Sequence, residues 1–190
     1  MSKAVLISIR PKWCEKIING EKVVEVRKTR PKLKTPFKCY IYCTSGGPDL
    51  NIPISSERLM QDYLDTGSMK SLNCPLGNGK VIGEFVCDMA FPFAVSDAGC
   101  IPSWNVWSLD RACLAYEKLA AYIGKGKTGY GLNISGLKIY DAPRELGEFY
   151  RPYKCGSCPA KWDAKCSGEC YRENKITRPP QSWCYVQEVE

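Results

Sequence analysis

The chain has 190 residues, a length typical of one domain and too short for two large ones. Its 44% hydrophobic and 25% charged residues are typical of a globular protein, and no apolar run approaches the ~18 residues that cross a bilayer. The net charge of +7 arises at one end, because residues 1–40 carry eight lysines and three arginines against three glutamates. This patch predicts a polyanionic partner, most commonly nucleic acid, although a solvated lysine-rich face has the same composition.

Periodic patterns along the chain predict both strands and helices. Strands are expected at residues 4–9, 22–29, 36–44, 80–90, 130–140 and 183–189. Helices are expected at residues 12–19, within 45–79, at 109–123 and, for about one turn, at 143–149. The helix at 109–123 has the clearest pattern, because apolar residues recur at helical spacing between Ser108, its expected cap, and Gly124.

This order of elements predicts an α+β fold with a curled, mostly antiparallel sheet, in a single domain over residues 1–190. Residues 45–79 are rich in Gly, Pro, Ser and Asn and are expected to form a helical insertion, capped by Ser55 or Ser56. Residues 150–182 hold four cysteines and few aliphatic residues, so we expect a second insertion that cannot form a hydrophobic core unaided.

An expected strand and short helix at the start of the chain are followed by G-x-K-x-x-E-x-R, formed by Gly20, Lys22, Glu25 and Arg27, and a later expected strand carries Glu84. With these motifs, residues 4–28 and 79–88 resemble the ASCH domain, which has the same motif and a glutamate in a later strand. Residues 129–146 and 176–186 resemble the tail of a bacterial and phage branch of that family. The four segments cover about half of the sequence.

ASCH domains are similar to PUA domains, so the resemblance implies a small, curled, PUA-like β-barrel with flanking helices. It also makes RNA, or a modified nucleoside or nucleotide, the leading ligand. One branch of small ASCH proteins hydrolyses the acetyl amide on the exocyclic amine of cytidine with a Lys, a Thr and a Glu, and other members are associated with RNA cleavage. Those three positions correspond to Lys22, Glu25 and Glu84. Glu25 departs from the pattern, because a carboxylate replaces the hydroxyl, and this favours binding over hydrolysis.

Lys22, Glu25 and Glu84 are therefore the candidate catalytic residues. A desolvated lysine beside a carboxylate provides a base in a chain without histidine, with Lys22 as the base and Glu84 orienting it. The alternative is an ion pair that joins two strands and performs no chemistry. In a regular strand residues 25 and 27 share a face and residue 22 lies on the other, so Lys22 joins them only through a turn or bulge after Gly20. We expect Lys22, Glu25 and Glu84 to converge on one basic cleft.

Four further residues are predicted to contact nucleic acid. Arg27, Lys28 and Arg30 would contact phosphates, which position a nucleic acid without reading its bases. Tyr130 is the preferred platform for a base, because the two glycines that flank it would let a ligand approach the backbone. The same glycines can instead mark a β-bulge.

The chain has twelve cysteines and no histidine, which excludes Ser–His and Cys–His nucleophile pairs and imidazole ligands. With no export signal evident, we expect a cytoplasmic protein with reduced thiols. Cys155, Cys158, Cys166 and Cys170 lie within sixteen residues, which suits a structural zinc site of four thiolates. Iron–sulfur or another metal is an alternative, as are unliganded or disulfide-linked cysteines.

The sequence thus predicts a protein that binds RNA or a nucleotide in a basic cleft, carries structural zinc and has no membrane partner. A hydrolase is the first alternative, acting either as an amidohydrolase of acylated cytidine or as a ribonuclease. A zinc-stabilised adaptor that binds another protein through residues 150–182 is the second.

Overall fold

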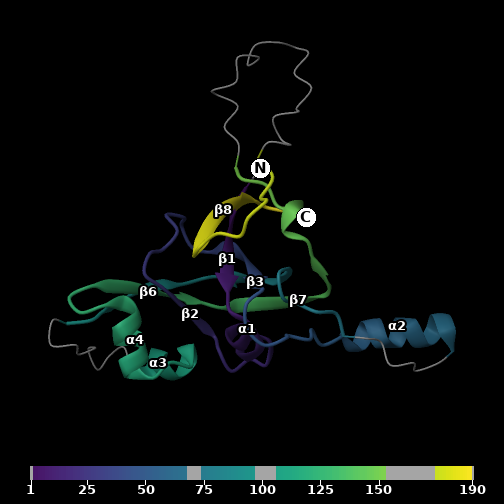
Figure 1. Ribbon diagram of the computed structural model, residues 1–190, viewed down its shortest axis with the longest axis horizontal. Coiled ribbons are helices and arrows are strands. Elements are labelled where there is room, and N and C mark those ends of the chain that lie inside the picture. Colours follow the sequence, from purple (N-terminus) through teal and green to yellow (C-terminus); the bar gives the residue numbers. More distant parts are fainter. Residues whose placement is uncertain (1, 68–73, 97–105, 153–173, 190) are drawn as a thin grey trace, which may run out of the picture.

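The computed structural model describes residues 2–67, 74–96, 106–152 and 174–189. The strands are β1 (Lys3–Ile9), β2 (Val24–Arg27), β3 (Phe37–Cys43), β4 (Val81–Cys87), β5 (Ala90–Ala94), β6 (Thr128–Asn133), β7 (Ser135–Arg144) and β8 (Trp183–Gln187). The helices are α1 (Pro11–Ile18), α2 (Ser56–Thr66), α3 (Val106–Ala112) and α4 (Tyr116–Ile123), and a 3₁₀ turn, η2, spans Leu146–Glu148. The predicted α+β class is confirmed (Figure 1).

The strands form two sheets that are not closed into the barrel that was predicted. The larger sheet has the order β7-β4-β3-β1-β8 and the smaller one β2-β6-β5, and within the described residues only β1 and β3 pair in parallel. β6 and β7 are separated by Ile134 alone, yet β6 pairs with β2 and β5 whereas β7 pairs with β4. The chain therefore passes from one sheet to the other at Ile134, and no ladder between described strands joins the two sheets.

Three groups of buried side chains hold these layers together. The first lies between α1 and the larger sheet and includes Val5, Ile7, Cys14, Ile17 and Ile41. The second lies between the smaller sheet and α3 and α4 and includes Val26, Phe93, Ala112, Leu119 and Ile123. The third lies on the other face of the larger sheet and includes Leu6, Tyr40, Phe149, Ile176 and Val186. Alternate residues of β1 point into the first and third groups, as expected for a strand buried on both faces.

The apolar stripe from Leu109 to Ile123 forms two helices, where the sequence predicted one. The chain turns after α3 at Cys113, which has a left-handed φ of 53°, and Ala115 is the N-cap of α4. Both ends of the stripe still pack in the second group, so the spacing predicted the burial correctly. Neither glycine nor proline marks the break, which is why the pattern did not reveal it.

The expected helix within residues 45–79 is α2. Ser55 is its cap, since the Ser55 hydroxyl accepts a hydrogen bond of 3.2 Å from the backbone N–H of Arg58. None of its side chains is buried, and Figure 1 shows it extending away from the sheets. Across the described part of the chain, no helix combines the length and the apolar character needed to cross a membrane.

Candidate functional site

A cavity of about 640 Å³ opens between residues of the two sheets. Its walls come from the ends of β1 and β3, from β2, from the start of α1, from α4 and from residues 179–182. The volume lies within the roughly 300–1,000 Å³ that ligand sites usually occupy. We call this cavity the cleft.

The cleft is lined by an excess of positive charge. Its cationic lining residues are Arg10, Lys12, Lys22, Arg27 and Lys118. Glu25 is the one carboxylate among the described residues that line it. Two parts differ in exposure, and we name them accordingly. The floor consists of the largely buried Lys22, Glu25 and Arg27, and the rim consists of the exposed Arg10, Lys12 and Lys118.

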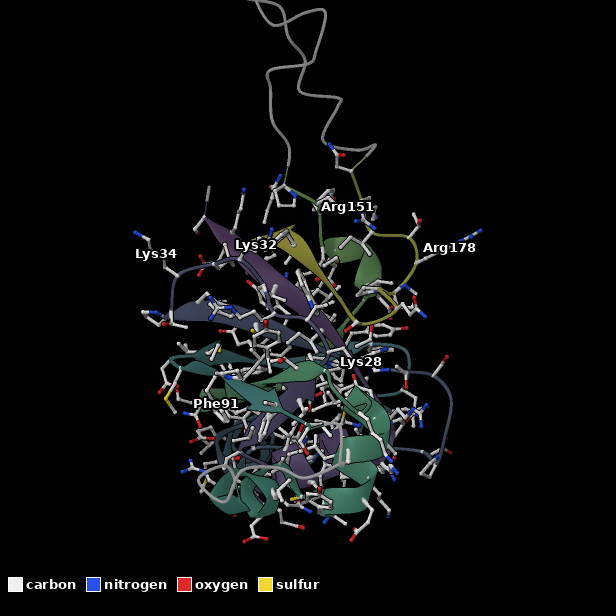
Figure 2. The ribbon with its side chains drawn as sticks, turned by 90° about the vertical axis from the view of Figure 1, so that its left-hand side faces the viewer. Lys28, Lys32, Lys34, Phe91, Arg151 and Arg178 are labelled. Carbon is white, nitrogen blue, oxygen red and sulfur yellow. The ribbon has the colours of Figure 1, made fainter. Side chains whose placement is uncertain are left out.

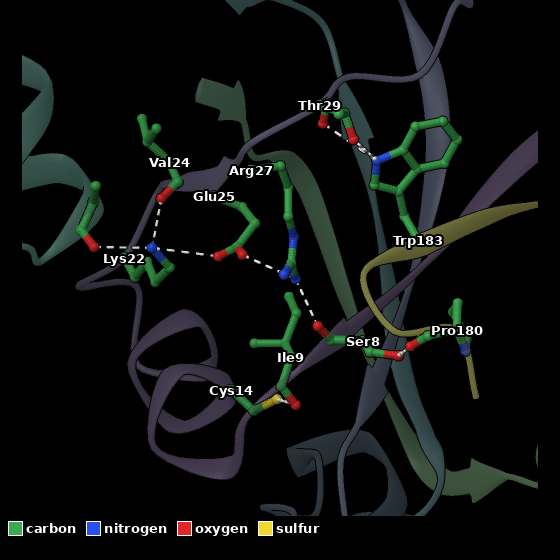
Figure 3. Close-up of polar contacts among 11 residues, drawn as sticks. Ser8, Ile9, Cys14, Lys22, Val24, Glu25, Arg27, Thr29, Pro180 and Trp183 are labelled. Carbon is green, nitrogen blue, oxygen red and sulfur yellow. Dashed lines mark hydrogen bonds and ion pairs between the residues drawn. The ribbon is translucent and has the colours of Figure 1, made fainter. Parts of the chain in front are cut away.

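The floor is a continuous network of charges (Figure 3). The Lys22 ammonium lies 3.3 Å from Oε2 of Glu25, and Nη2 of Arg27 lies 3.0 Å from Oε1 of the same carboxylate. Nη2 of Arg27 also donates a hydrogen bond of 2.6 Å to the backbone carbonyl of Ser8 in β1. The Glu25 side chain is only 8% exposed. Lys22 and Arg27 balance its negative charge, so no ligand is needed to neutralise it. The network links the smaller sheet to the larger one.

The break between α3 and α4 supplies part of this network. Ala112 is the last residue of α3, and the last carbonyls of a helix have no partner within it. The Lys22 ammonium donates to the Ala112 carbonyl at 2.9 Å and to the Val24 carbonyl at 2.7 Å. A cation at this position is also favoured by the negative end of the helix dipole. Had the helix continued to Ile123, the Ala112 carbonyl would bond within the helix.

The geometry around Lys22 has a chemical consequence. An ammonium has three N–H donors, and those of Lys22 have three acceptors in Val24, Ala112 and Glu25. The side chain is 3% exposed. Lys22 therefore holds the backbone together at this point through two hydrogen bonds, and its charge is paired with Glu25.

The rim differs because its cations have no carboxylate to compensate them. Among the described residues, no acid lies within ion-pair distance of Arg10, Lys12 or Lys118. The Lys12 ammonium lies over the face of Trp13, 4.7 Å from the ring centroid. The first turn of α1, which starts here, has no acidic residue and no side-chain cap. The rim is therefore open to an anion.

Aromatic side chains line the cleft beside these charges. Trp13, Tyr42 and Tyr122 contribute to the wall. Burial raises the pKa of Tyr42 above its usual range. The wall formed by residues 179–182 is fixed to β1, because the Ser8 hydroxyl donates a hydrogen bond of 2.6 Å to the Pro180 carbonyl.

Glu84 does not join the other two candidate catalytic residues. Its carboxylate accepts a hydrogen bond of 2.6 Å from the Tyr140 hydroxyl and lies 3.5 Å from the Lys38 ammonium, and it does not line the cleft. The register of β3 against β4 shifts between Ile41 and Tyr42, so the strict alternation that the sequence assumed is interrupted.

The shift places Ile82 and Glu84 on different faces of the larger sheet. Ile82 packs in the first buried group, whereas Glu84 lies opposite Tyr40, which belongs to the third group. In a regular strand the two side chains would share a face, because they are two residues apart. The expected convergence of Glu84 with Lys22 and Glu25 is not observed.

The predicted nucleic-acid contacts are divided between the cleft and its surroundings. Arg27 lies in the floor. Lys28 lies just outside the cleft, with its ammonium 5.2 Å from the ring centroid of Tyr122. Arg30 lies 6.0 Å from the ring of Tyr130, and neither of these two side chains lines the cleft.

The glycines around Tyr130 are explained by packing within the protein. A Cβ atom added at Gly131 would lie 2.6 Å from the Phe91 ring, and one added at Gly129 would lie 2.6 Å from the Ile123 side chain. These contacts require the absence of a side chain whether or not a ligand binds.

The predicted zinc ligands Cys155, Cys158, Cys166 and Cys170 lie outside the described residues. Within the described ranges, no group of three or more His, Cys, Asp or Glu side chains is arranged to hold a metal ion.

The sequence did not single out Arg10, Trp13, Lys118 and Tyr122 as site residues. Trp13 was predicted only as part of the apolar face of a helix. A signal was present, because Lys118 and Tyr122 are four residues apart and therefore share a face of α4. What the sequence lacks is the position of that face against α1.

Comparison with solved structures identifies the fold. The chain is similar to the crystal structure of ASCH from Zymomonas mobilis, at 16% identity and a TM-score of 0.55, over 97% of this chain and 88% of that chain. A Tyr-to-Phe mutant of the same protein matches at 16% identity and a TM-score of 0.56, over 98% of this chain and 92% of that chain. A Ser-to-Ala mutant matches at 16% identity and a TM-score of 0.55, over 97% of this chain and 89% of that chain. No family model and no curated protein sequence matches the chain. The chain therefore has the ASCH fold that its sequence motifs predicted.

Proposed function

We propose that this chain binds RNA or a nucleotide in the cleft. The observation that carries the proposal is the difference between rim and floor. Glu25 is balanced by Lys22 and Arg27, so the exposed rim cations present an uncompensated positive charge to the solvent. Phosphate groups are the complementary ligand for such a surface.

The aromatic wall supports a nucleotide over a simple inorganic anion. Trp13 and Tyr122 are side chains on which an unstacked base can stack, and each stacked base contributes roughly 1–3 kcal/mol in single-strand sites. The cleft volume of about 640 Å³ suits a nucleotide. Sequence-specific RNA recognition in general uses unpaired bases on such platforms.

The floor favours binding over hydrolysis as the function of the cleft. A general base must reach a proton of the substrate. The N–H donors of Lys22 are matched by protein acceptors, and both oxygens of Glu25 face cations. Hydrolysis of an acylated cytidine or of RNA would require this network to open first.

The direct test is the affinity of a single-stranded RNA of about 12 nucleotides, measured by fluorescence anisotropy as a function of salt. We expect the double variant Arg10→Gln, Lys12→Gln to bind about 25-fold more weakly at ~0.1 M salt, because each lost phosphate contact removes about 0.7 from the slope of log K against log salt. Circular dichroism would verify that the variant is folded.

The matched control is Arg58→Gln, Lys127→Gln, which removes the same charge from exposed positions outside the cleft. An equal loss in both variants would reduce the effect to net charge and refute a cleft site. An affinity that does not change between low and moderate salt would also refute it.

We also propose that Cys155, Cys158, Cys166 and Cys170 hold structural zinc. Four thiolates at this spacing are a suitable donor set, and the bound metal would stabilise a segment with few aliphatic residues. Elemental analysis of purified protein should give about one equivalent of zinc. Less than about a tenth of an equivalent of any transition metal would exclude the site.

A further inference from the structure

The loop between β2 and β3 carries a second concentration of uncompensated charge. Residues 28–36, which we call the basic loop, include Lys28, Arg30, Lys32 and Lys34 and no acidic residue. All four side chains are exposed. Within the described part of the chain, none of them has a carboxylate within ion-pair distance. Their charge is therefore available to a ligand.

The basic loop is fixed in place by two aromatic side chains of β8. The indole N–H of Trp183 lies 3.2 Å from both the carbonyl and the hydroxyl oxygen of Thr29 (Figure 3). The backbone N–H of Lys32 donates to the Tyr185 hydroxyl at 2.8 Å, and the two aromatic rings pack edge to face. Cations on a backbone that is already ordered lose less entropy when a ligand binds.

A second cavity, of about 530 Å³, lies against the far end of this loop. It is lined by Arg30, Lys32, Leu33, Lys34, Thr35 and Ala90. Half of these residues are cations and none is acidic. The cavity therefore offers a further site for negatively charged groups, separate from the cleft.

The cleft and the second cavity are connected by charged residues. Arg27 lines the cleft, and Lys28 contacts the ring of Tyr122, which lines it as well. Arg30 follows two residues later and lines the second cavity. Figure 2 shows Lys32 and Lys34 above and to the left of Lys28, on the side away from Arg178.

The cleft and the second cavity are separate, because they have no lining residue in common. A mononucleotide whose base stacks on the aromatic wall of the cleft lies in the cleft and leaves the second cavity empty. A strand with regularly spaced phosphates can contact both.

We propose that the basic loop is a second phosphate-contact surface, and that the ligand is a single-stranded RNA that extends from the cleft along the loop to the second cavity. This inference rests on the proposed function and narrows it, because it excludes a free nucleoside or mononucleotide as the complete ligand. A single strand is required because the bases that reach Trp13 and Tyr122 in the cleft must be unstacked.

The test compares a long and a short ligand on the variant Lys32→Gln, Lys34→Gln. We expect it to bind a single-stranded RNA of about 12 nucleotides about 25-fold more weakly than the wild type at ~0.1 M salt, with the salt slope reduced by about 1.4. Its affinity for uridine monophosphate, measured by calorimetry, should equal that of the wild type. The control Arg58→Gln, Lys127→Gln should change neither affinity.

The outcomes separate this inference from the proposed function. If Lys32→Gln, Lys34→Gln keeps wild-type affinity for the RNA while Arg10→Gln, Lys12→Gln loses it, the extended path is wrong and the cleft site stands. If the wild type binds uridine monophosphate as tightly as the RNA, the extended path is also wrong. Equal or tighter binding of duplex RNA of the same length would overturn the single-stranded ligand. If the wild type binds uridine monophosphate but no RNA, this inference fails and the proposed function stands as nucleotide binding. If the wild type binds neither ligand, the proposed function fails together with this inference.

Discussion

The floor and the rim of the cleft contain the same types of cation in opposite situations. Lys22 and Arg27 are largely buried and share the carboxylate of Glu25. Arg10 and Lys12 are exposed, and no acid of the described ranges lies within ion-pair distance of them. All of them belong to the basic N-terminal region that gives the chain its net charge. The excess positive charge of the N-terminal region is thus divided between cations that maintain the fold and cations that remain available to a ligand.

The two situations also differ in what a substitution costs. Removing one partner of a buried ion pair leaves the other charge uncompensated in a medium of low polarity. Removing an exposed, unpaired cation leaves no such penalty, and its effect on stability stays within about 0.5 kcal/mol. Changes in the floor should therefore alter folding, and changes in the rim should alter binding.

The largest expected effect is that of Lys22→Ala on stability. In this variant the carbonyls of Val24 and Ala112 lose their hydrogen-bond donor, and Glu25 keeps only the ion pair with Arg27. We therefore expect the free energy of unfolding to fall by about 3 kcal/mol. Urea unfolding monitored by circular dichroism measures this change. Lys118→Ala, in the rim, is the control and should leave the unfolding midpoint unchanged.

The same variant separates the structural role of Lys22 from a catalytic one. If Lys22 is a catalytic base, Lys22→Ala should abolish turnover of acetylated cytidine or of labelled RNA while its melting temperature barely changes. Such a result would contradict the role that we assign to the floor.

The next effect concerns Tyr140 and Glu84, which lie outside the cleft. Tyr140→Phe removes the donor to a partly buried carboxylate, so the free energy of unfolding should fall by about 1.5 kcal/mol. RNA affinity should stay at the wild-type value, since neither residue lines the cleft. A large loss of RNA affinity in the folded variant would contradict this and would indicate that Glu84 belongs to the RNA-binding site.

The pH dependence of stability provides a second measurement on Tyr140. Burial, and then the hydrogen bond to Glu84, raise the pKa of Tyr140 above the usual value near 10. The folded protein thus keeps a proton that the unfolded chain loses above about pH 10, so this contribution to stability is complete below about pH 10 and declines as the pH rises further. Tyr140→Phe should show a smaller alkaline loss in urea unfolding at pH 9 to 11.

The sequence predicted the local part of the site and missed the distant part. Lys22, Glu25 and Arg27 lie within six residues, and one turn after Gly20 is enough to bring them together. The Ala112 carbonyl that completes the contacts of Lys22 comes from a helix end 90 residues away. Helix α3 ends there because the chain turns at Cys113, and the sequence has no glycine or proline at this turn from which it could be predicted.

The strands β1, β2, β3, β4 and β8 lie where the sequence predicted them, because alternation depends on the neighbouring residues of one segment. The single strand expected at residues 130–140 is divided between β6 and β7, and β5 was not predicted as a separate strand. Strand division, sheet closure and face assignment were not predicted, because they depend on how segments pair. The chain changes sheets at Ile134, and the shifted register of β3 against β4 reverses the face of Glu84 relative to Ile82. Register shifts of this kind arise from the pairing of two strands, which the pattern of one strand does not contain.

The smallest effect sharpens the comparison at one rim position. Lys118→Gln should weaken binding of the single-stranded RNA about 5-fold at ~0.1 M salt, the change expected for one lost phosphate contact, and should leave the unfolding free energy unchanged. Lys125→Gln is the matched control, because Lys125 is exposed and lies beyond the end of the same helix, α4, without lining the cleft. A 5-fold difference between these two variants can only come from position, since both remove one positive charge. If both variants lose affinity equally, the rim contributes only through the overall positive charge of the protein. The difference between the paired cations of the floor and the unpaired cations of the rim would then not explain where RNA binds.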